Sequence, residues 1–167
     1  MQDYDIYEMI HESLNAIPIG VTIADINGKI IYTNTAEAIM HGYTVEELIG
    51  KDARIFAPLH LWKRVEFEET YKMGEWKRET VNIKKNGELF FVHLTSIAVK
   101  DKSGIPIGII TVCEDITKHK RLEDELKKRL KELEEFYEIA VGRELRVKQL
   151  KEENEELKEA LKKYEKS

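Results

Sequence analysis

Cysteine is nearly absent from this chain of 167 residues, which contains only Cys113. A single cysteine excludes an internal disulfide, a zinc knuckle and a Cys-x-x-Cys redox pair. Long apolar runs are absent too, since none approaches the roughly 20 residues that a transmembrane helix needs. The first residues, Met-Gln-Asp-Tyr-Asp, lack the basic and apolar regions of a signal peptide. We therefore expect a cytoplasmic protein with no membrane partner.

A clustered excess of basic residues is also missing. Residues 1–117 carry 12 basic and 18 acidic side chains, and residues 118–167 carry 15 basic and 14 acidic ones. Nucleic-acid binding depends on Lys and Arg side chains that gather on one surface and neutralise phosphates. We therefore expect no nucleic-acid partner.

Enzyme motifs are missing as well. The chain has no Gly-rich phosphate loop, no cyclase motif and no ATP-binding box. The phosphoacceptor histidine of a kinase is followed by an acidic residue and Asn-Pro, whereas His119 is followed by Lys-Arg-Leu. We therefore expect no enzymatic activity, and we assign no catalytic residues and no metal ligands.

The distribution of Pro and Gly divides the chain. Its last part contains no Pro and only Gly142, and Leu recurs there at helical spacing. Earlier apolar runs are short and are separated by turn signals such as Asn27-Gly28 and Asn86-Gly87. We predict an N-terminal amphipathic helix in residues 1–17, a folded domain in residues 18–117 and a C-terminal helix in residues 118–167.

Hydrophobic periodicity predicts two strands, several short helices and three more strands. Strands are expected at residues 21–25, 29–33, 76–84, 88–99 and 105–114. Helical segments are expected at residues 34–43, at residues 44–47 and after Pro58. Short turns make the last three strands an antiparallel meander, so the helices must cover one face of the sheet. The predicted fold class is α+β, with a five-stranded antiparallel sheet covered by short helices.

Six segments between residues 10 and 117 follow one another in the order and spacing of a known family. They are Ile19–Asp25, Gly28–Asn34, Gly42–Gly50, Lys84–Glu88, Ile107–Thr111 and Asp115–Thr117. Together they resemble a PAS domain. The resemblance implies a sensory or partner-binding module that is usually cytoplasmic, often dimeric and not itself catalytic. Residues 136–145 are similar to connectors that join PAS domains to the output modules of microbial sensor histidine kinases. The resemblance thus implies an output kinase or cyclase domain, or another protein, as the partner.

The resemblance makes haem one cofactor to consider. Haem-binding PAS domains use a histidine on the long central helix, and the matching position falls near Lys63 rather than at His60. Glu114 stands where the oxygen-sensing members have an Arg. These departures argue against haem.

Flavin is the other cofactor. Light-sensing PAS domains bond it through the cysteine of a Gly-x-Asn-Cys-Arg motif, and here the matching run is Gly-Lys-Asp-Ala-Arg, with Ala53 in place of the cysteine. Asn82 matches one polar residue that holds the flavin ring, but Val92 and Cys113 replace two others. The residues therefore argue against blue-light chemistry, and we interpret Cys113 as a small buried hydrophobe. The cofactor, if there is one, stays unassigned.

A pocket between the central helices and the sheet would suit a small apolar or weakly polar ligand. We expect Asn34 and Asn82 to be its polar anchors. Alternatively, the same residues fill the core, and a neighbouring protein supplies the signal. The apolar residues expected to line the pocket are Ile39, Ile55, Val65, Phe90, Val92, Leu94 and Val112.

The C-terminal segment carries a heptad pattern whose second half is regular. One column contains Val147, Asn154 and Leu161, and the other contains Leu150 and Leu157. An Asn in such a seam pairs with its copy in a parallel partner and favours two strands. We therefore predict a parallel homodimer, although the register of residues 118–146 stays open, because those residues could instead pack against the sheet. A single solvated helix is the other alternative.

These expectations combine into one hypothesis for function. A cytoplasmic PAS sensor homodimerises and relays a conformational signal through a parallel coiled coil, with or without a small ligand. Asp115 and Thr117 are expected to couple the last strand to the helix by capping it. The alternative is an adaptor that senses nothing and uses the fold and the exposed helix for protein–protein interaction.

Overall fold

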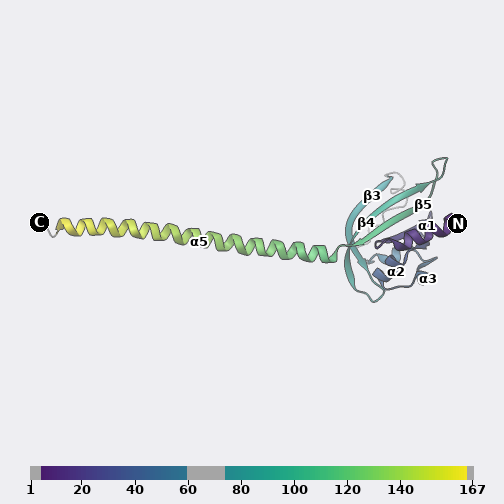
Figure 1. Cartoon of the computed structure of the whole chain (residues 1–167), viewed down its shortest axis with the longest axis horizontal. Coiled ribbons are helices and arrows are strands. Elements are labelled where there is room, and N and C mark those ends of the chain that lie inside the picture. Colours follow the sequence, from purple (N-terminus) through teal and green to yellow (C-terminus); the bar gives the residue numbers. More distant parts are fainter. Residues whose placement is uncertain (1–4, 60–73, 165–167) are drawn as a thin grey trace. The chain divides into compact units, whose positions relative to one another are not determined.

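The computed structural model describes residues 5–59 and 74–164 of the chain. They divide into two compact units between residues 120 and 121. The described residues of the N-terminal unit form three α-helices, a 3₁₀-helix, five strands and the start of α5, and the remainder of α5 forms the second unit (Figure 1). The elements are α1 (Ile6–Ala16), β1 (Gly20–Asp25), β2 (Ile30–Thr33), α2 (Thr35–His41), α3 (Val45–Leu48), η1 (Ala53–Phe56), β3 (Glu75–Ile83), β4 (Leu89–Lys100), β5 (Pro106–Asp115) and α5 (Thr117–Tyr164).

The five strands form one antiparallel sheet in the order β2-β1-β5-β4-β3. The last strand, β5, lies in the middle and pairs with β1 on one side and β4 on the other. Helices α2 and α3 lie beside the β1–β2 end of the sheet (Figure 1). The predicted α+β class, the five antiparallel strands and the meander of the last three are therefore confirmed.

Local capping chemistry explains where the short helices begin and end. The side chain of Asn34 accepts a hydrogen bond from the first turn of α2, and Gly42 ends that helix in a left-handed conformation with φ of 75°. Helix α3 begins with a capping box, in which Thr44 and Glu47 each satisfy the other's backbone N–H. Both helices were predicted from these residues, whereas η1 was not.

Helix α1 confirms the predicted N-terminal helix, which ends before Pro18. Asp5 caps it by accepting a hydrogen bond from the Tyr7 N–H. Its apolar residues Ile6 and Ile10 are exposed in the single chain. The helix predicted after Pro58 lies outside the described residues.

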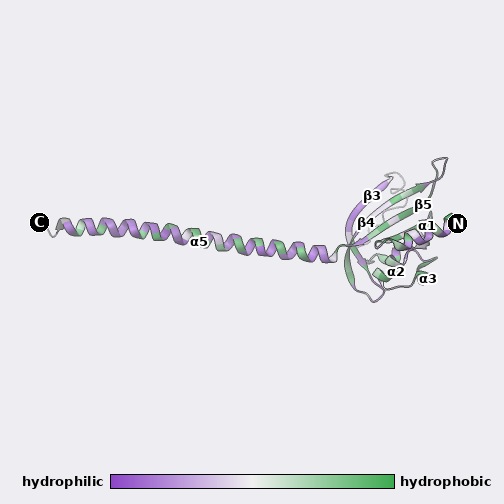
Figure 2. Ribbon diagram, viewed as in Figure 1, coloured by the Kyte–Doolittle hydropathy of each residue, from purple (hydrophilic) through white to green (hydrophobic). Residues whose placement is uncertain are grey.

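Apolar side chains gather in two clusters of the N-terminal unit. Ile30, Ala38, Leu48 and Phe56 form one of them, beneath α2 and α3. Phe90, Val92, Leu94 and Cys113 form the other, on β4 and β5. Figure 2 shows the corresponding contrast between the hydrophobic β4 and β5 and the more hydrophilic β3.

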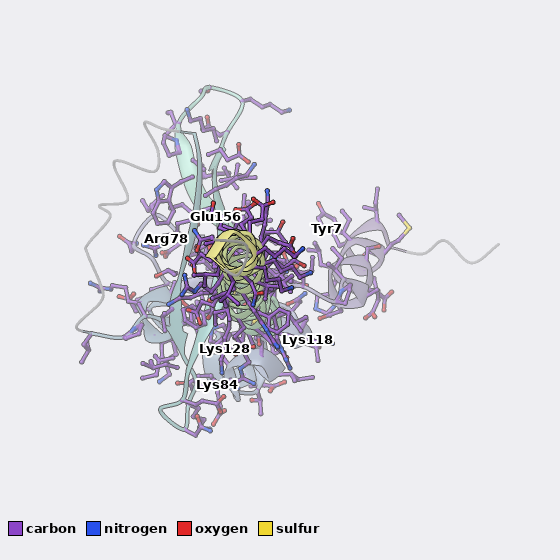
Figure 3. The ribbon with its side chains drawn as sticks, turned by 90° about the vertical axis from the view of Figure 1, so that its left-hand side faces the viewer. Tyr7, Arg78, Lys84, Lys118, Lys128 and Glu156 are labelled. Atoms are coloured by element: carbon purple, nitrogen blue, oxygen red, sulfur yellow. The ribbon has the colours of Figure 1, made fainter. Side chains whose placement is uncertain are left out.

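Helix α5 is 48 residues long and continuous. Charged side chains such as Lys118, Lys128 and Glu156 project around it (Figure 3), and ion pairs one turn apart, such as Lys127 with Glu123 at 3.0 Å, add modest support. In the described parts of the chain, no helix combines the length with the apolar content that crossing a membrane requires.

Candidate functional site

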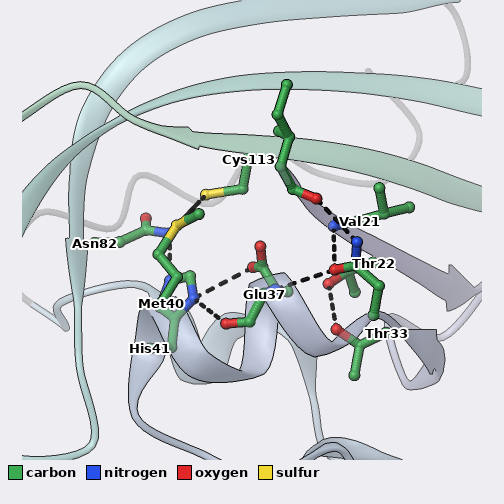
Figure 4. Close-up of polar contacts among 10 residues, drawn as sticks. Val21, Thr22, Thr33, Glu37, Met40, His41, Asn82 and Cys113 are labelled. Carbon is green, nitrogen blue, oxygen red and sulfur yellow. Dashed lines mark hydrogen bonds and ion pairs between the residues drawn. The ribbon is translucent and has the colours of Figure 1, made fainter. Parts of the chain in front are cut away.

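A buried polar cluster lies between α2 and the inner face of β3 and β5. Glu37 and His41 share one face of α2, Asn82 comes from β3 and Cys113 from β5 (Figure 4). His41 Nδ1 lies 3.2 Å from the backbone oxygen of Glu37 and 3.4 Å from its Oε1. The Asn82 amide nitrogen donates to His41 Nε2 at 3.0 Å and lies 3.9 Å from Cys113 Sγ.

These contacts fix the tautomer of His41. Because the Asn82 amide donates to Nε2, that atom accepts, and the ring proton is on Nδ1, where it donates to the Glu37 carbonyl. Burial lowers the pKa of His41 to about 4. The same desolvation raises the pKa of Glu37 to about 8, against a smaller opposing effect of the Cys113 thiol. Glu37 and His41 therefore form a neutral pair near pH 7 rather than a salt bridge.

Gly20 on β1 makes room for the Glu37 carboxyl group. A Cβ at this position would lie 1.7 Å from Glu37 Oε2 and 3.2 Å from the backbone oxygen of Cys113. No hydrogen-bond partner within the described chain reaches Oε2. The cluster thus contains a buried polar atom directed at the inner side of the sheet.

An apolar wall adjoins the polar cluster. Phe90, Val92 and Leu94 alternate along β4 and pack with Cys113, and Met40 of α2 contacts this group. The His41 ring lies 5.0 Å from the ring of Phe90 and 4.2 Å from that of Phe56. Four of the residues expected at the pocket, Asn82, Phe90, Val92 and Leu94, are therefore brought together here.

Other residues expected at the pocket lie elsewhere. Ile39 is 72% exposed on the outer side of α2, so the prediction that it lines a pocket is wrong. Val112 is also misplaced, because side chains alternate along β5 and Cys113 faces the cluster. Ile55 is partly buried but packs against the first apolar cluster. Val65 lies outside the described residues.

Asn34 is buried, but it is not free to anchor a ligand. Its oxygen accepts hydrogen bonds from the backbone N–H groups of Val21 and Glu37. Its amide nitrogen donates to the carbonyl oxygens of Leu14 and Ile19. Asn34 therefore ties α1, β1 and α2 together, and its expected role in the pocket is wrong.

Sequence reasoning missed Glu37 and His41. Their spacing of four residues places them on one face of a helix, and a His beside the apolar Met40 was the available signal. Cys113 was expected to be buried, and its side chain is. Burial raises the pKa of its thiol, so it is not a reactive thiolate.

A second feature is the junction of β5 with α5. Thr117 Oγ1 accepts a hydrogen bond from the Phe91 N–H at 3.0 Å, and it contacts the Phe91 carbonyl oxygen at 3.4 Å. The backbone N–H of Ile116 also donates to that oxygen. Asp115 Oδ1 accepts from the Thr117 N–H at 2.8 Å. Lys120 forms an ion pair with Glu79 of β3. The first turn of α5 is thus attached to three strands, and both residues expected to couple strand and helix lie at this junction.

The residues expected in the dimer seam all lie on α5. Val147, Leu150, Leu157 and Leu161 are exposed in the single chain, as is Asn154. The long helix is consistent with a coiled coil, and the pairing itself stays a prediction.

Comparison with known proteins identifies relatives of the N-terminal unit. Residues 18–118 match the family described as PAS domain. A blue-light photoreceptor of Listeria innocua is 28% identical over 142 residues, which are 81% of this chain and 56% of the photoreceptor. The sensor protein TdiS of Thauera aromatica is 31% identical over 113 residues, 65% of this chain and 20% of TdiS. This chain thus spans about half of one relative and a fifth of the other.

A solved structure shows the same fold. The PAS domain of a Colwellia psychrerythraea protein superposes with a TM-score of 0.60 at 21% identity, over 68% of this chain and 99% of that one.

The described residues do not fit a cysteinyl flavin adduct. Ala53 of η1 carries no thiol, and Cys113 is on β5, with its Sγ 3.8 Å from Met40 Sδ. The Asn82 amide is already engaged by His41. Of the residues that argue against haem, His60 and Lys63 lie outside the described residues, and Glu114 lies near the end of β5. The match over residues 18–118, together with the shared fold, shows that this chain belongs to the PAS domain family.

Proposed function

We propose that this chain is a PAS sensor module that homodimerises through α5 and relays a conformational signal from its sheet into a parallel coiled coil. The relatives that carry similar PAS domains include a sensor protein and a photoreceptor, which supports a role in signal transduction. In this proposal the module is cytoplasmic and has no catalytic activity. It passes its signal to a kinase or cyclase output domain or to a partner protein.

The Thr117–Phe91 contact carries the proposal. Phe91 lies between Phe90 and Val92, whose side chains belong to the buried apolar wall. Any change that moves this wall moves the Phe91 backbone, and both polar groups of that backbone contact Thr117. In this proposal, a movement of the inner face of the sheet is therefore passed to Thr117, the first residue of α5, through the backbone of Phe91 in β4.

The apolar side chains of α5 support dimerisation. Leu150, Leu157 and Leu161 recur at seam spacing and are exposed in the single chain. Burying a Leu side chain contributes about 1.5–3 kcal/mol. A second copy of the same helix would cover them and would place the two Asn154 amides opposite each other.

The molecular mass in solution tests the dimer. We expect wild-type protein to be dimeric by light scattering coupled to gel filtration. The Asn154→Leu variant should change oligomeric state, because it removes the polar residue that favours two strands. A wild-type monomer would contradict the proposal and favour the adaptor, whose helix pairs with another protein.

Disulfide cross-linking tests the orientation. In a parallel dimer residue 157 faces its own copy, so Leu157→Cys should cross-link on mild oxidation. Glu159→Cys, on the outer side of the same helix, is the matched control and should stay reduced. Cys113 does not interfere, because it is buried. Equal cross-linking of both variants, or of neither, would contradict a parallel seam.

We further propose that any ligand in the domain is held without a flavin–cysteine bond. The absence of a thiol at Ala53 and the engaged Asn82 amide support this. An absorbance spectrum and denaturing mass spectrometry of freshly purified protein test it. A co-purified small molecule without flavin absorption is the expected result, whereas a flavin band that bleaches under blue light would contradict it.

A further inference from the structure

A cluster of metal-ligating side chains lies inside the N-terminal unit. Glu37, His41 and Cys113 each offer one ligand atom, and these atoms all lie within 4.8 Å of one another (Figure 4). All three residues are buried, with exposed fractions of 2% or less. Two elements far apart in the sequence, α2 and β5, supply them.

Glu37 is the residue that points to a ligand. Its Oε2 atom is buried and has no hydrogen-bond partner among the described residues. Leaving a buried polar group unpaired is costly, so such an atom in a folded chain calls for an explanation. Gly20 keeps the space around it open, because any Cβ there would collide with Oε2.

The charges of the three groups match a divalent ion. On metal binding, Glu37 and Cys113 each release a proton to solvent, and the resulting carboxylate and thiolate together balance a dication, while the imidazole adds no charge. Nε2 of His41 accepts a hydrogen bond from the Asn82 amide, so the ring carries one proton and is in the neutral form that binds metals. An ion with these ligands would leave little net charge in the buried site, which limits the cost of burial.

The geometry is close to that of a tetrahedral site. Metal–ligand bonds of about 2.0–2.3 Å at tetrahedral angles separate ligand atoms by about 3.3–3.5 Å. His41 Nδ1 and Glu37 Oε1 are already 3.4 Å apart. No two of the three ligand atoms are more than 4.8 Å apart, so reaching these values requires an approach of about 1.3–1.5 Å at most.

The ligand types select the class of ion. One nitrogen, one oxygen and one sulfur suit zinc and similar transition metals, whereas Mg²⁺ and Ca²⁺ prefer oxygen. Asn82 contacts Nε2 of His41 and so orients the ring with Nδ1 toward Glu37. When Nδ1 binds a metal, the ring proton moves to Nε2, and the Asn82 amide must turn its oxygen to accept it.

We propose that Glu37, His41 and Cys113 bind one divalent transition-metal ion of the zinc class inside the PAS domain, with Asn82 as a positioning residue. Because the site is enclosed, the ion enters during folding or a transient opening. This inference does not depend on the dimer or the relay, since metal content is measured per chain.

Metal loading of the whole chain tests the site. Untagged protein is refolded from urea with Zn²⁺ or Co²⁺, dialysed and analysed by elemental mass spectrometry. We expect about one ion per chain. The Co²⁺ form should show d–d absorption of tetrahedral intensity and a thiolate-to-cobalt charge-transfer band.

Near-isosteric variants assign the ligands. Cys113→Ser should abolish the charge-transfer band, and Glu37→Gln should weaken metal binding at least about 10-fold. His93→Gln is the matched control, because it removes a histidine of β4 that lies outside the cluster, and it should keep full loading. Circular dichroism verifies that each variant is folded. The proposal is overturned if folded wild-type protein retains no ion, or if the control variant lowers loading as much as Cys113→Ser does.

Discussion

The packing of Glu37 over Gly20 can be measured by a double-mutant cycle. In Gly20→Ala the new Cβ would lie 1.7 Å from Glu37 Oε2 and 2.9 Å from Glu37 Cδ. The carboxyl group must then leave its position or β1 must shift. Overpacking of this kind costs about 1–3 kcal/mol, so we expect the free energy of unfolding to fall by about 2 kcal/mol.

Removing the carboxyl group should relieve this cost. In a Glu37→Ala background the nearest remaining atom of those that the new Cβ would meet is the Cys113 carbonyl oxygen at 3.2 Å, a contact that small adjustments can accommodate. Gly20→Ala should then cost less than about 1 kcal/mol, which gives a coupling energy between the two sites of about 1–2 kcal/mol.

Gly108 offers a matched control. A Cβ at Gly108 would lie 2.6 Å from the backbone oxygen of Ala24, an obstruction that Glu37 does not create. Gly108→Ala should therefore cost the same in both backgrounds. Urea unfolding followed by circular dichroism measures all variants, at one protein concentration and with a chelator present, because dimerisation and metal binding both shift apparent stability. If Gly20→Ala costs as much without the Glu37 carboxyl as with it, the described orientation of Glu37 is wrong.

Three further changes probe the junction, the core and the surface. Thr117→Val removes the hydroxyl contacts with Phe91. We therefore expect the free energy of unfolding to fall by about 1 kcal/mol and hydrogen exchange at the Phe91 amide to become faster. Unchanged exchange would contradict the attachment of α5 to β4. Asn34→Ala removes a helix cap, leaves the buried Val21 N–H without its acceptor and leaves two part-buried carbonyl groups without their donor. Urea unfolding should therefore show a loss of about 3 kcal/mol in the free energy of unfolding, against about 1 kcal/mol for loss of the exposed cap in Thr44→Ala. The hydrogen bond from Lys85 lowers the pKa of Glu47 below 4.5, so its stabilisation is present above that pH and disappears as the pH falls through the lowered value. Thermal melts of wild type and Glu47→Gln should therefore differ near pH 7 and converge in acid, and a constant difference would contradict this.

The elements that could be predicted from the sequence are those with local causes. Asn34 and Gly42 cap the two ends of α2, and the capping box of Thr44 and Glu47 begins α3. The residues of each pair act on backbone groups only a few positions away, so the local sequence is enough to identify them. The strands could be predicted equally well, because alternating apolar and polar residues mark the strands and turn residues mark their ends.

The buried cluster could not be predicted in the same way. A Glu is rarely buried, so Glu37 reads as a solvent-facing residue of its helix. Its burial depends on Gly20 and on the position of β5, which only the tertiary fold determines. The prediction that Ile39 lines the pocket was wrong because an apolar side chain was assumed to be buried. Glu37, Ala38 and His41 face inward, which turns Ile39 outward despite its apolar side chain.

In the proposed relay, the single residue between β5 and α5 would make the length of the helix a determinant of the signal. Each residue of an α-helix adds about 100° of rotation. One residue inserted after the first turn of α5 would therefore rotate every later side chain by about 100° relative to that turn, whereas seven would nearly restore the original phase. Natural or engineered fusions to this helix should tolerate changes in length by whole heptads and lose regulation with other lengths.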